Sequence, residues 1–160
     1  MFGGIQWLDF LGLFLLLSGF VVGLGAVTVI DIQGLLGRKS KYWTETATRT
    51  QKVTKPLIWM GICLGLIGGF IFYRNFGFRG IPFVQFCLAI MLLLNGCFLS
   101  FKVSPFLLDK EKQNQAGEPI PFSWQWKIAI SLIVSDIGWW GSLVLFVLFV
   151  LKNMKFYYGQ

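Results

Sequence analysis

Residues 128–151, IAISLIVSDIGWWGSLVLFVLFVL, give the clearest indication of the fold. The run is apolar apart from a few small residues and one carboxylate, Asp136, and it is bounded by Lys127 and Lys152. A helix that crosses a bilayer needs about 20 mostly apolar residues, because the hydrocarbon core is about 30 Å thick. The run is too long and too poor in charge for a helix in a soluble core. It therefore predicts a membrane-spanning helix.

Three further stretches of the same kind lie upstream, at residues 10–30, 57–73 and 81–101. Within lipid every backbone N–H and C=O needs an internal partner, so such spans are helical. The chain is 56% hydrophobic and only 13% charged, about half the charged share of a soluble domain. The sequence predicts one all-α domain over residues 1–160, a four-transmembrane-helix up-down bundle.

Basic residues predict the orientation of this bundle. The two long connections hold ten Lys and Arg, whereas the two termini and the short second loop hold four. Because cytoplasmic loops carry the excess of Lys and Arg, both basic loops are expected in the cytoplasm and both termini on the outer side of a bacterial inner or plasma membrane. The net charge of +7 follows from this bias. It predicts contact with anionic lipid headgroups rather than with nucleic acid.

Both basic loops are expected to lie at the membrane surface. In the first, Glu45 and Arg49 are four residues apart, which suits a helical turn. Pro56 is expected to kink or start the second span. In the second loop, Ser104 and Pro105 are typical of an N-cap followed by the first helical residue, so a short surface helix is expected after them.

Small residues recur along three of the spans at helical spacing. In lipid, helices associate by close backbone approach along such stripes. The stripes are expected to pack helices within the chain, or else to face a second copy or another subunit. The residues concerned are Gly19, Gly23, Gly61, Gly65, Gly69, Ser131, Ser135, Gly138 and Ser142.

Asp136 is the most informative single residue, because it lies well inside its span. Nine residues after Lys127, it is roughly 13 Å deep at 1.5 Å per residue. A carboxylate there costs about 2.5–3.5 kcal/mol on insertion scales. Asn95, at a similar depth, and the indole of Trp140 are the expected partners. These three residues form a candidate intramembrane polar site, which either holds a proton, ion or ligand or only joins helices.

Two carboxylates bound the first span and are expected to form ion pairs at its ends. The expected pairs are Asp9 with Arg74 or Arg79, and Asp31 with Arg38 or Lys39.

Absent residue types exclude several classes of function. The chain has no His, which removes His-ligated haem, zinc or copper sites and His as a general base. None of the three Cys belongs to a C-x-x-C pair, so neither a metal cluster nor a disulfide framework is expected. No catalytic residue, metal or cofactor is assigned.

These features favour a small non-catalytic multi-pass membrane protein, a structural or accessory subunit that assembles with copies of itself or with other membrane-protein subunits. An alternative is a small transporter or channel whose polar site is formed by Asp136 and Asn95. A third is an enzyme acting on lipid or quinone at the membrane interface, with Asp9, Asp31 or Glu45 as its acid.

Overall fold

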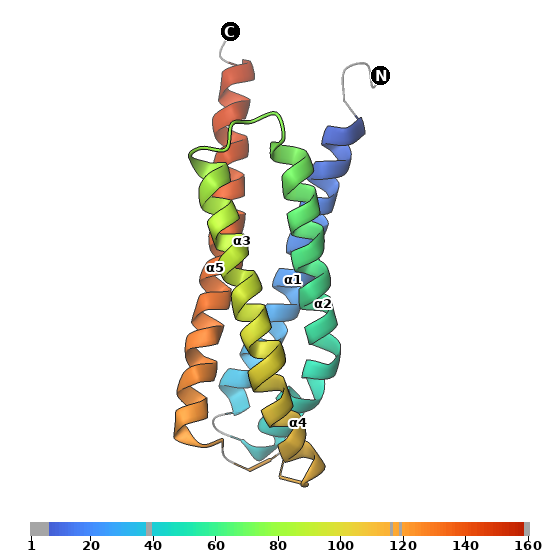
Figure 1. The fold of residues 1–160 in the computed structure, drawn as a ribbon, viewed down its shortest axis with the longest axis vertical. Coiled ribbons are helices and arrows are strands. Elements are labelled where there is room, and N and C mark those ends of the chain that lie inside the picture. The colour runs from blue at the N-terminus through green and yellow to red at the C-terminus, as the bar shows by residue number, and fades with distance from the viewer. Residues whose placement is uncertain (1–6, 38–39, 116, 119, 159–160) are drawn as a thin grey trace.

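The computed structural model describes residues 7–37, 40–115, 117–118 and 120–158, with side chains as far as Asn153. Within that part of the chain all regular structure is helical. Four long helical segments run up and down along one axis, and α1 begins at the end of the bundle where α5 finishes (Figure 1). They are α1 (Trp7–Gly37), α2 (Lys41–Tyr73), α3 (Ile81–Phe98) with its continuation α4 (Ser104–Lys112), and α5 (Phe122–Tyr158).

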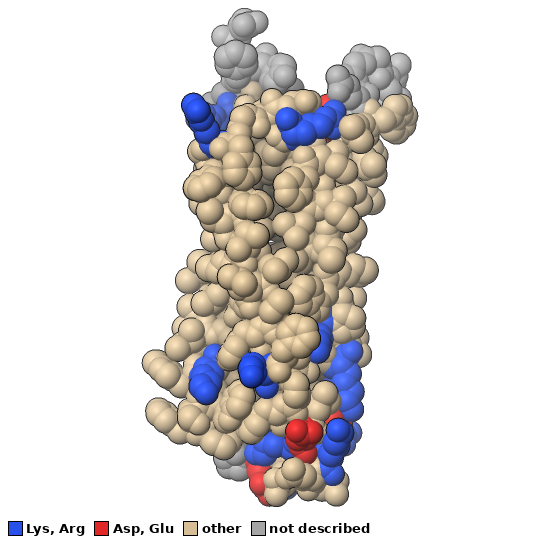
Figure 2. Space-filling model, in the orientation of Figure 1, with Lys and Arg blue, Asp and Glu red and all other residues tan. Residues whose placement is uncertain are grey.

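Each of the four segments is long and apolar enough to cross a membrane. The predicted all-helical fold with four candidate spans is confirmed. On the face drawn in Figure 2, charged residues gather towards the two ends and leave an uncharged band between them. Exposed side chains of the spans include Phe14, Val21, Ile67 and Val144. An apolar outer surface of this kind is favourable against lipid, as expected for an integral multi-pass membrane protein.

The second helix is longer than its predicted span. It begins at Lys41, so the Thr-rich segment 41–55 is part of α2, and the prediction of a surface loop there is wrong. Hydropathy missed this segment because its residues are polar. Threonine hydroxyls nevertheless donate to carbonyls one turn back, as Thr48 does to Thr44 at 3.0 Å.

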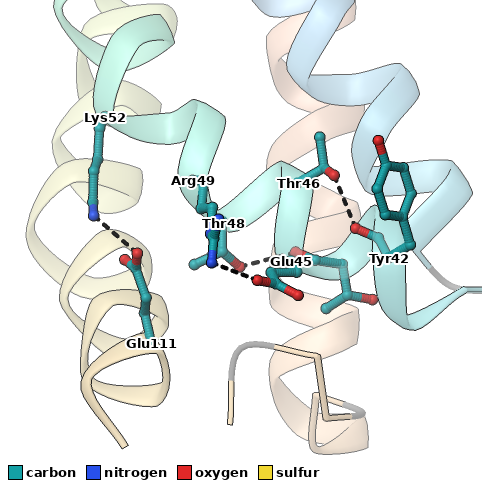
Figure 3. Close-up of polar contacts among 8 residues, drawn as sticks. Tyr42, Glu45, Thr46, Thr48, Arg49, Lys52 and Glu111 are labelled. Carbon is teal, nitrogen blue, oxygen red and sulfur yellow. Dashed lines mark hydrogen bonds and ion pairs between the residues drawn. The ribbon is translucent and has the colours of Figure 1, made fainter. Parts of the chain in front are cut away.

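The predicted helical turn within this segment is confirmed by an ion pair. Arg49 Nη2 and Glu45 Oε1 are 2.6 Å apart, one helical turn from each other (Figure 3). Pro56 lies inside α2 and does not start it. Because a proline removes one helical N–H and crowds the preceding turn, it bends a helix, and α2 bends in its lower half (Figure 1).

A π-helical turn, η1 (Leu99–Val103), joins α3 to α4, so residues 81–112 form one continuous segment. The predicted short helix with Pro105 at its start is present as α4, but it continues α3, and the prediction that Ser104 is its N-cap is wrong. Its backbone N–H donates to the Leu99 carbonyl five residues back, and no side-chain cap forms. The next residue, Pro105, has no N–H to continue the α-helical pattern. The wider turn before it accommodates the proline without ending the segment.

Glycines bring α1 and α2 into direct backbone contact. A Cβ atom at Gly19 would lie 2.6 Å from the Gly65 nitrogen, and one at Gly61 would lie 2.5 Å from the Gly23 Cα. A Cβ atom at Gly68 would meet the α1 backbone at least as closely. Only residues without a side chain allow two backbones this close. We call this contact the glycine seam.

Two glycines of the predicted stripe turn their Cβ positions away from the α1 backbone, although the backbone of Gly65 itself takes part in the glycine seam. A Cβ atom at Gly65 would meet nothing within 4 Å, and one at Gly69 would meet only a Leu16 methyl at 4.0 Å. The reason is helical phase. At about 100° per residue, Gly68 lies about 20° from Gly61 around α2, whereas Gly69 lies about 80° away.

The small residues of α5 also face the interior. Ser131, Ser135 and Ser142 are buried, and a Cβ atom at Gly138 would lie 2.5 Å from Cδ2 of Leu92 in α3. These positions make room for side chains from α1 and α3. Most of the small-residue positions are therefore packed against helices of this chain, and Gly65 and Gly69 border the second cavity.

Candidate functional site

A cavity of about 500 Å³ lies in the half of the bundle that holds the α1–α2 connection. The end of α1, the first half of α2, η1 with α4, and the first half of α5 form its wall. Most of this wall is apolar, as is usual for small-molecule sites of this size. Its polar residues include Asp31, Thr48, Gln51, Thr54, Lys55, Ser100, Ser104, Gln125 and Ser135. We call this space the inner cavity.

Asp31 is the buried charge on this wall. It is 7% exposed, and apart from the neighbouring Asp136 carboxyl group no donor among the described residues bonds either oxygen. The predicted partners Arg38 and Lys39 lie outside those residues. Both oxygens are buried from solvent, so the carboxyl group is enclosed by protein rather than presented to the inner cavity.

A second carboxyl group lies next to Asp31. Asp136 of α5 is close enough for a hydrogen bond between the two side chains. Both carboxylates can only accept hydrogen bonds, so such a bond forms when one of them carries a proton. Asp136 is exposed on the outside of the α1–α5 contact, whereas Asp31 borders the inner cavity. With a proton shared in this way, the pair carries at most one negative charge and joins α1 to α5.

Asn95 has a different partner from the one that the sequence suggested. Its Nδ2 donates to the Ser131 carbonyl at 2.9 Å, and the Ser131 hydroxyl donates to its Oδ1 at 2.6 Å. Asp136 comes five residues after Ser131, about 140° further around α5, and so lies away from Asn95. Trp140 is 51% exposed, on the outside of α5. Asn95 therefore bonds Ser131 rather than Asp136, whereas Trp140 lies one turn from Asp136 on the exposed side of α5.

The π turn supplies a polar group to the inner cavity. In π-helical bonding the N–H of residue 105 would bond the Ser100 carbonyl, but Pro105 has no N–H. Lys55 Nζ donates to this carbonyl instead, at 3.3 Å. Trp59 Nε1 donates to the Ser100 hydroxyl at 2.9 Å. These bonds hold Lys55 and Trp59 of α2 against η1 on the cavity wall.

An ion pair ties α2 to α4 on the same side of the bundle. Lys52 Nζ lies 2.9 Å from Glu111 Oε1, and Figure 3 shows the two side chains meeting across the gap between the helices. Both side chains are partly exposed, so the pair contributes only about 0–1 kcal/mol. Its effect is to fix the position of α4 beside the polar half of α2.

A second cavity, of about 450 Å³, lies in the other half of the bundle. We call it the outer cavity. Apolar residues of α2 and α3 form much of its wall, and Figure 2 shows a hollow in the upper half of the face drawn. Gln85 Nε2 donates to the Ser142 carbonyl there at 2.9 Å, and the buried Tyr73 hydroxyl faces the Gln85 side chain.

A core layer separates the two cavities. Val27 borders the inner cavity, and Ile62, Leu92 and Trp139 border the outer one. All four belong to one cluster of buried apolar residues. Trp139 is 4% exposed, and its ring fills the space that Gly23 leaves open. These packed side chains lie between the two cavities.

The other candidate acids are engaged in ion pairs. Asp9 Oδ1 lies 2.9 Å from Arg74 Nη2, which confirms one of the two predicted partners. Glu45 pairs with Arg49. Asp31 is therefore the one acid of the three proposed for an enzyme that is not held by a base within the described ranges. No group of three potential metal-binding side chains occurs among the described residues.

The sequence missed most of the polar wall of the inner cavity. Thr48, Gln51 and Lys55 fell in a segment interpreted as a loop. Had that segment been treated as helix, their spacing of three and four residues would have shown a polar stripe. Ser100 could be recognised only through the π turn and Pro105, a pattern that hydropathy does not detect.

No family model matches the chain, and neither the curated proteins nor the solved structures contain a significant match to it. The site must therefore be interpreted from its own geometry.

Proposed function

We propose that this chain is a small transporter, in which the inner cavity holds the substrate and the core layer is the barrier. The observation that carries the proposal is that two cavities lie one above the other along the bundle, separated by one packed layer, with the buried Asp31 on one side of that layer. Buried polar or ionisable groups at several depths are typical of transport paths in membranes. Here the buried Gln85, Asp31 and Thr48 lie at different depths, and the partly buried Asn95 lies between Gln85 and the inner cavity residues of η1.

The proposal moves the binding site suggested by the sequence. Asp31 takes the central place, Asp136 lies beside it, and Asn95 joins α3 to α5. We further propose that the end bearing the inner cavity faces the cytoplasm, because it carries most of the Lys and Arg. The substrate then enters or leaves the inner cavity on the cytoplasmic side of a plasma membrane.

Flux through proteoliposomes tests this function. The solutes are choline, benzoate, betaine and glycerol, which represent an organic cation, an anion, a zwitterion and a neutral molecule. At least one should cross faster than in protein-free vesicles, and Ala47→Trp should abolish the difference, because Ala47 lines the inner cavity. Thr46→Trp is the matched control, since Thr46 does not line it. Equal rates for all four solutes with and without protein would refute transport.

One observation favours the alternative of an accessory subunit. Asp136 is exposed at membrane depth, and Ile133, Ile137 and Trp140 are exposed on the same helix. A carboxylate facing lipid is costly, whereas a neighbouring subunit with a basic or hydrogen-bonding side chain would stabilise it. The occupant of this face would be a helix of another membrane protein, because most of the small-residue positions already pack within the chain.

Native mass spectrometry of gently extracted protein tests the subunit function. A second polypeptide should accompany the 18.2 kDa chain and should be lost in Asp136→Leu. Ile90→Leu, on an exposed position of α3, should retain it. A chain that is always alone would contradict this second function and leave transport as the explanation of the fold.

A further inference from the structure

We propose that the outer cavity is a binding site for a membrane lipid, with one acyl chain of the lipid lying along it. The proposal goes beyond the proposed function and does not depend on it, because the core layer lies between this cavity and the inner one. The volume of the outer cavity is about 450 Å³, which is in the range of sites that hold small organic molecules.

Two glycines leave room along the α2 side of the outer cavity. Gly65 and Gly69 both line it, and they are one helical turn apart. A Cβ atom at Gly65 would meet nothing within 4 Å, and one at Gly69 would meet only a Leu16 methyl group at 4.0 Å. The space in front of these two positions is therefore free of side chains, and it runs lengthwise along the helix. An elongated ligand fits such a space.

The surface that the outer cavity presents is mainly apolar. Its larger polar side chains are turned into the protein, since Gln85 Nε2 donates to the Ser142 carbonyl at 2.9 Å, and Gln85 Oε1 and the Tyr73 hydroxyl are buried from solvent. Among the described residues of the wall the one charged side chain is Arg74, which pairs with Asp9 at the end of the bundle. Apolar cavities stay dry and take up hydrocarbon. The wall therefore favours a hydrocarbon chain over a polar solute.

The length of the outer cavity fits one acyl chain. Its α2 wall runs from Ile62 in the core layer to Arg74 just after the end of the helix. These residues are twelve positions apart, which is about 18 Å at 1.5 Å per residue. The hydrocarbon core of a bilayer is about 30 Å thick, so one leaflet contributes about 15 Å. A lipid with its headgroup at the level of Arg74 can therefore extend its chain to the core layer.

The outer cavity borders the surface that faces lipid. In its half of the bundle α2 and α3 stand apart (Figure 1), and the hollow of Figure 2 lies on that face. Phe70 of α2 lines the cavity and is also 64% exposed. Its ring meets the ring of Phe86 in α3, with centroids 6.3 Å apart, and the two rings form part of the rim. In a bilayer this rim is surrounded by acyl chains, so a lipid chain is the hydrocarbon that meets it.

A photoactivatable lipid tests the proposal. The full chain is reconstituted in vesicles of phosphatidylcholine that carries a diazirine near the end of one acyl chain. After irradiation, mass spectrometry maps the labelled residues. Ile62 and Leu92 should be labelled, because they border the outer cavity and are only 6% and 7% exposed, out of reach of lipid on the outer surface. Labels confined to exposed side chains such as Val21 and Val144 would overturn the proposal.

Two variants fill the outer cavity from opposite walls. Gly65→Leu places a side chain in the open space beside α2, and Ala89→Leu enlarges a side chain on the α3 wall. Each should lower the labelling of Leu92 by about fivefold or more, because the new side chain and the acyl chain compete for the same space. Ala89→Leu keeps the test decisive if Gly65→Leu does not fold.

Gly25→Leu is the matched control. Gly25 is exposed on α1, nothing lies within 4 Å of its Cβ position, and it borders neither cavity. Labelling of Leu92 in this variant should equal that of the unchanged protein. The proposal would be refuted by equal labelling of Leu92 in the control and in the variants with a filled cavity.

The lipid site and the transport function can fail separately. Labelling of Leu92 without flux of any solute would retain the lipid site and reject transport. Flux without labelling of Leu92 would retain transport and reject the lipid site.

Discussion

The glycine seam between α1 and α2 and the contact between α3 and α5 both use small residues, yet they are built differently. In the glycine seam one backbone meets another, so that a Cβ atom at Gly19 would lie 2.6 Å from the Gly65 nitrogen. Between α3 and α5, Gly138 receives the Leu92 side chain and Ser131 bonds Asn95. A leucine side chain can change rotamer, but a helical backbone cannot move alone. The same substitution should therefore cost more in the glycine seam.

The largest effect is expected from Gly68→Ala. Its new methyl group would meet the α1 backbone, and overpacking of this kind costs about 1–3 kcal/mol of unfolding free energy, here at the upper end. Gly65→Ala is the matched control three residues away, with nothing near its Cβ position. Because alanine is the better helix former, the control should be neutral or gain about 0.5–1 kcal/mol. Unfolding in mixed micelles measures both, and equal losses would disprove the role of the glycine seam.

An intermediate effect is expected from Gly138→Ala. Its methyl group would meet the Leu92 side chain, which can adjust, so the loss should be about 1 kcal/mol. Adding Leu92→Val should recover part of that loss by removing a methylene from the crowded space. No side-chain truncation should rescue Gly68→Ala in this way. If the pair Gly138→Ala and Leu92→Val were no more stable than expected from additive losses, the difference between the two contacts would disappear.

A smaller effect is expected from the hydrogen bonds between α3 and α5. A double-mutant cycle on Asn95→Ala and Ser131→Ala should give a coupling energy of about 0.6–1.7 kcal/mol, the range found for such bonds between membrane helices. The same unfolding measurement provides it. A coupling energy of zero would mean that α3 and α5 associate through packing alone.

The smallest effect is expected from the ion pair at the end of the glycine seam. Asp9→Asn removes the contact to Arg74, and both side chains are partly exposed. The loss should be about 0–1 kcal/mol and should shrink as salt is added. Unfolding at low and high salt checks this. A loss as large as that of Gly68→Ala would show that charge, and not backbone contact, holds α1 to α2.

The four spans could be predicted because a membrane helix is recognised by the summed hydrophobicity of about 20 residues. No single side chain determines that sum. The start of α2 could not, because Thr48 and its neighbours are polar on average and become helical only through local bonds and packing against the other helices. Pro105 suggested the beginning of a separate helix. The π turn that accommodates this proline within a longer helical segment could not be inferred from the local sequence.

The site was harder to predict, because it depends on how each helix is rotated about its axis. The sequence placed Asp136 and Asn95 at similar depths, which is a matter of counting residues. Whether they meet depends on rotation, and α5 turns Ser131 towards α3 and Asp136 towards Asp31. The rotation of α2 about its own axis likewise decides that Gly68, and not Gly69, meets the α1 backbone. The spacing of small residues shows which of them share one side of a helix, but it does not show which neighbouring helix that side faces.

The connection between α1 and α2 is short, running only from Gly37 to Lys41. Its shortness matters for biosynthesis. When a ribosome has completed α2, both faces of the glycine seam already exist, and the brief link keeps them at high effective concentration. The hairpin therefore has the contacts it needs to form without α3, α4 or α5.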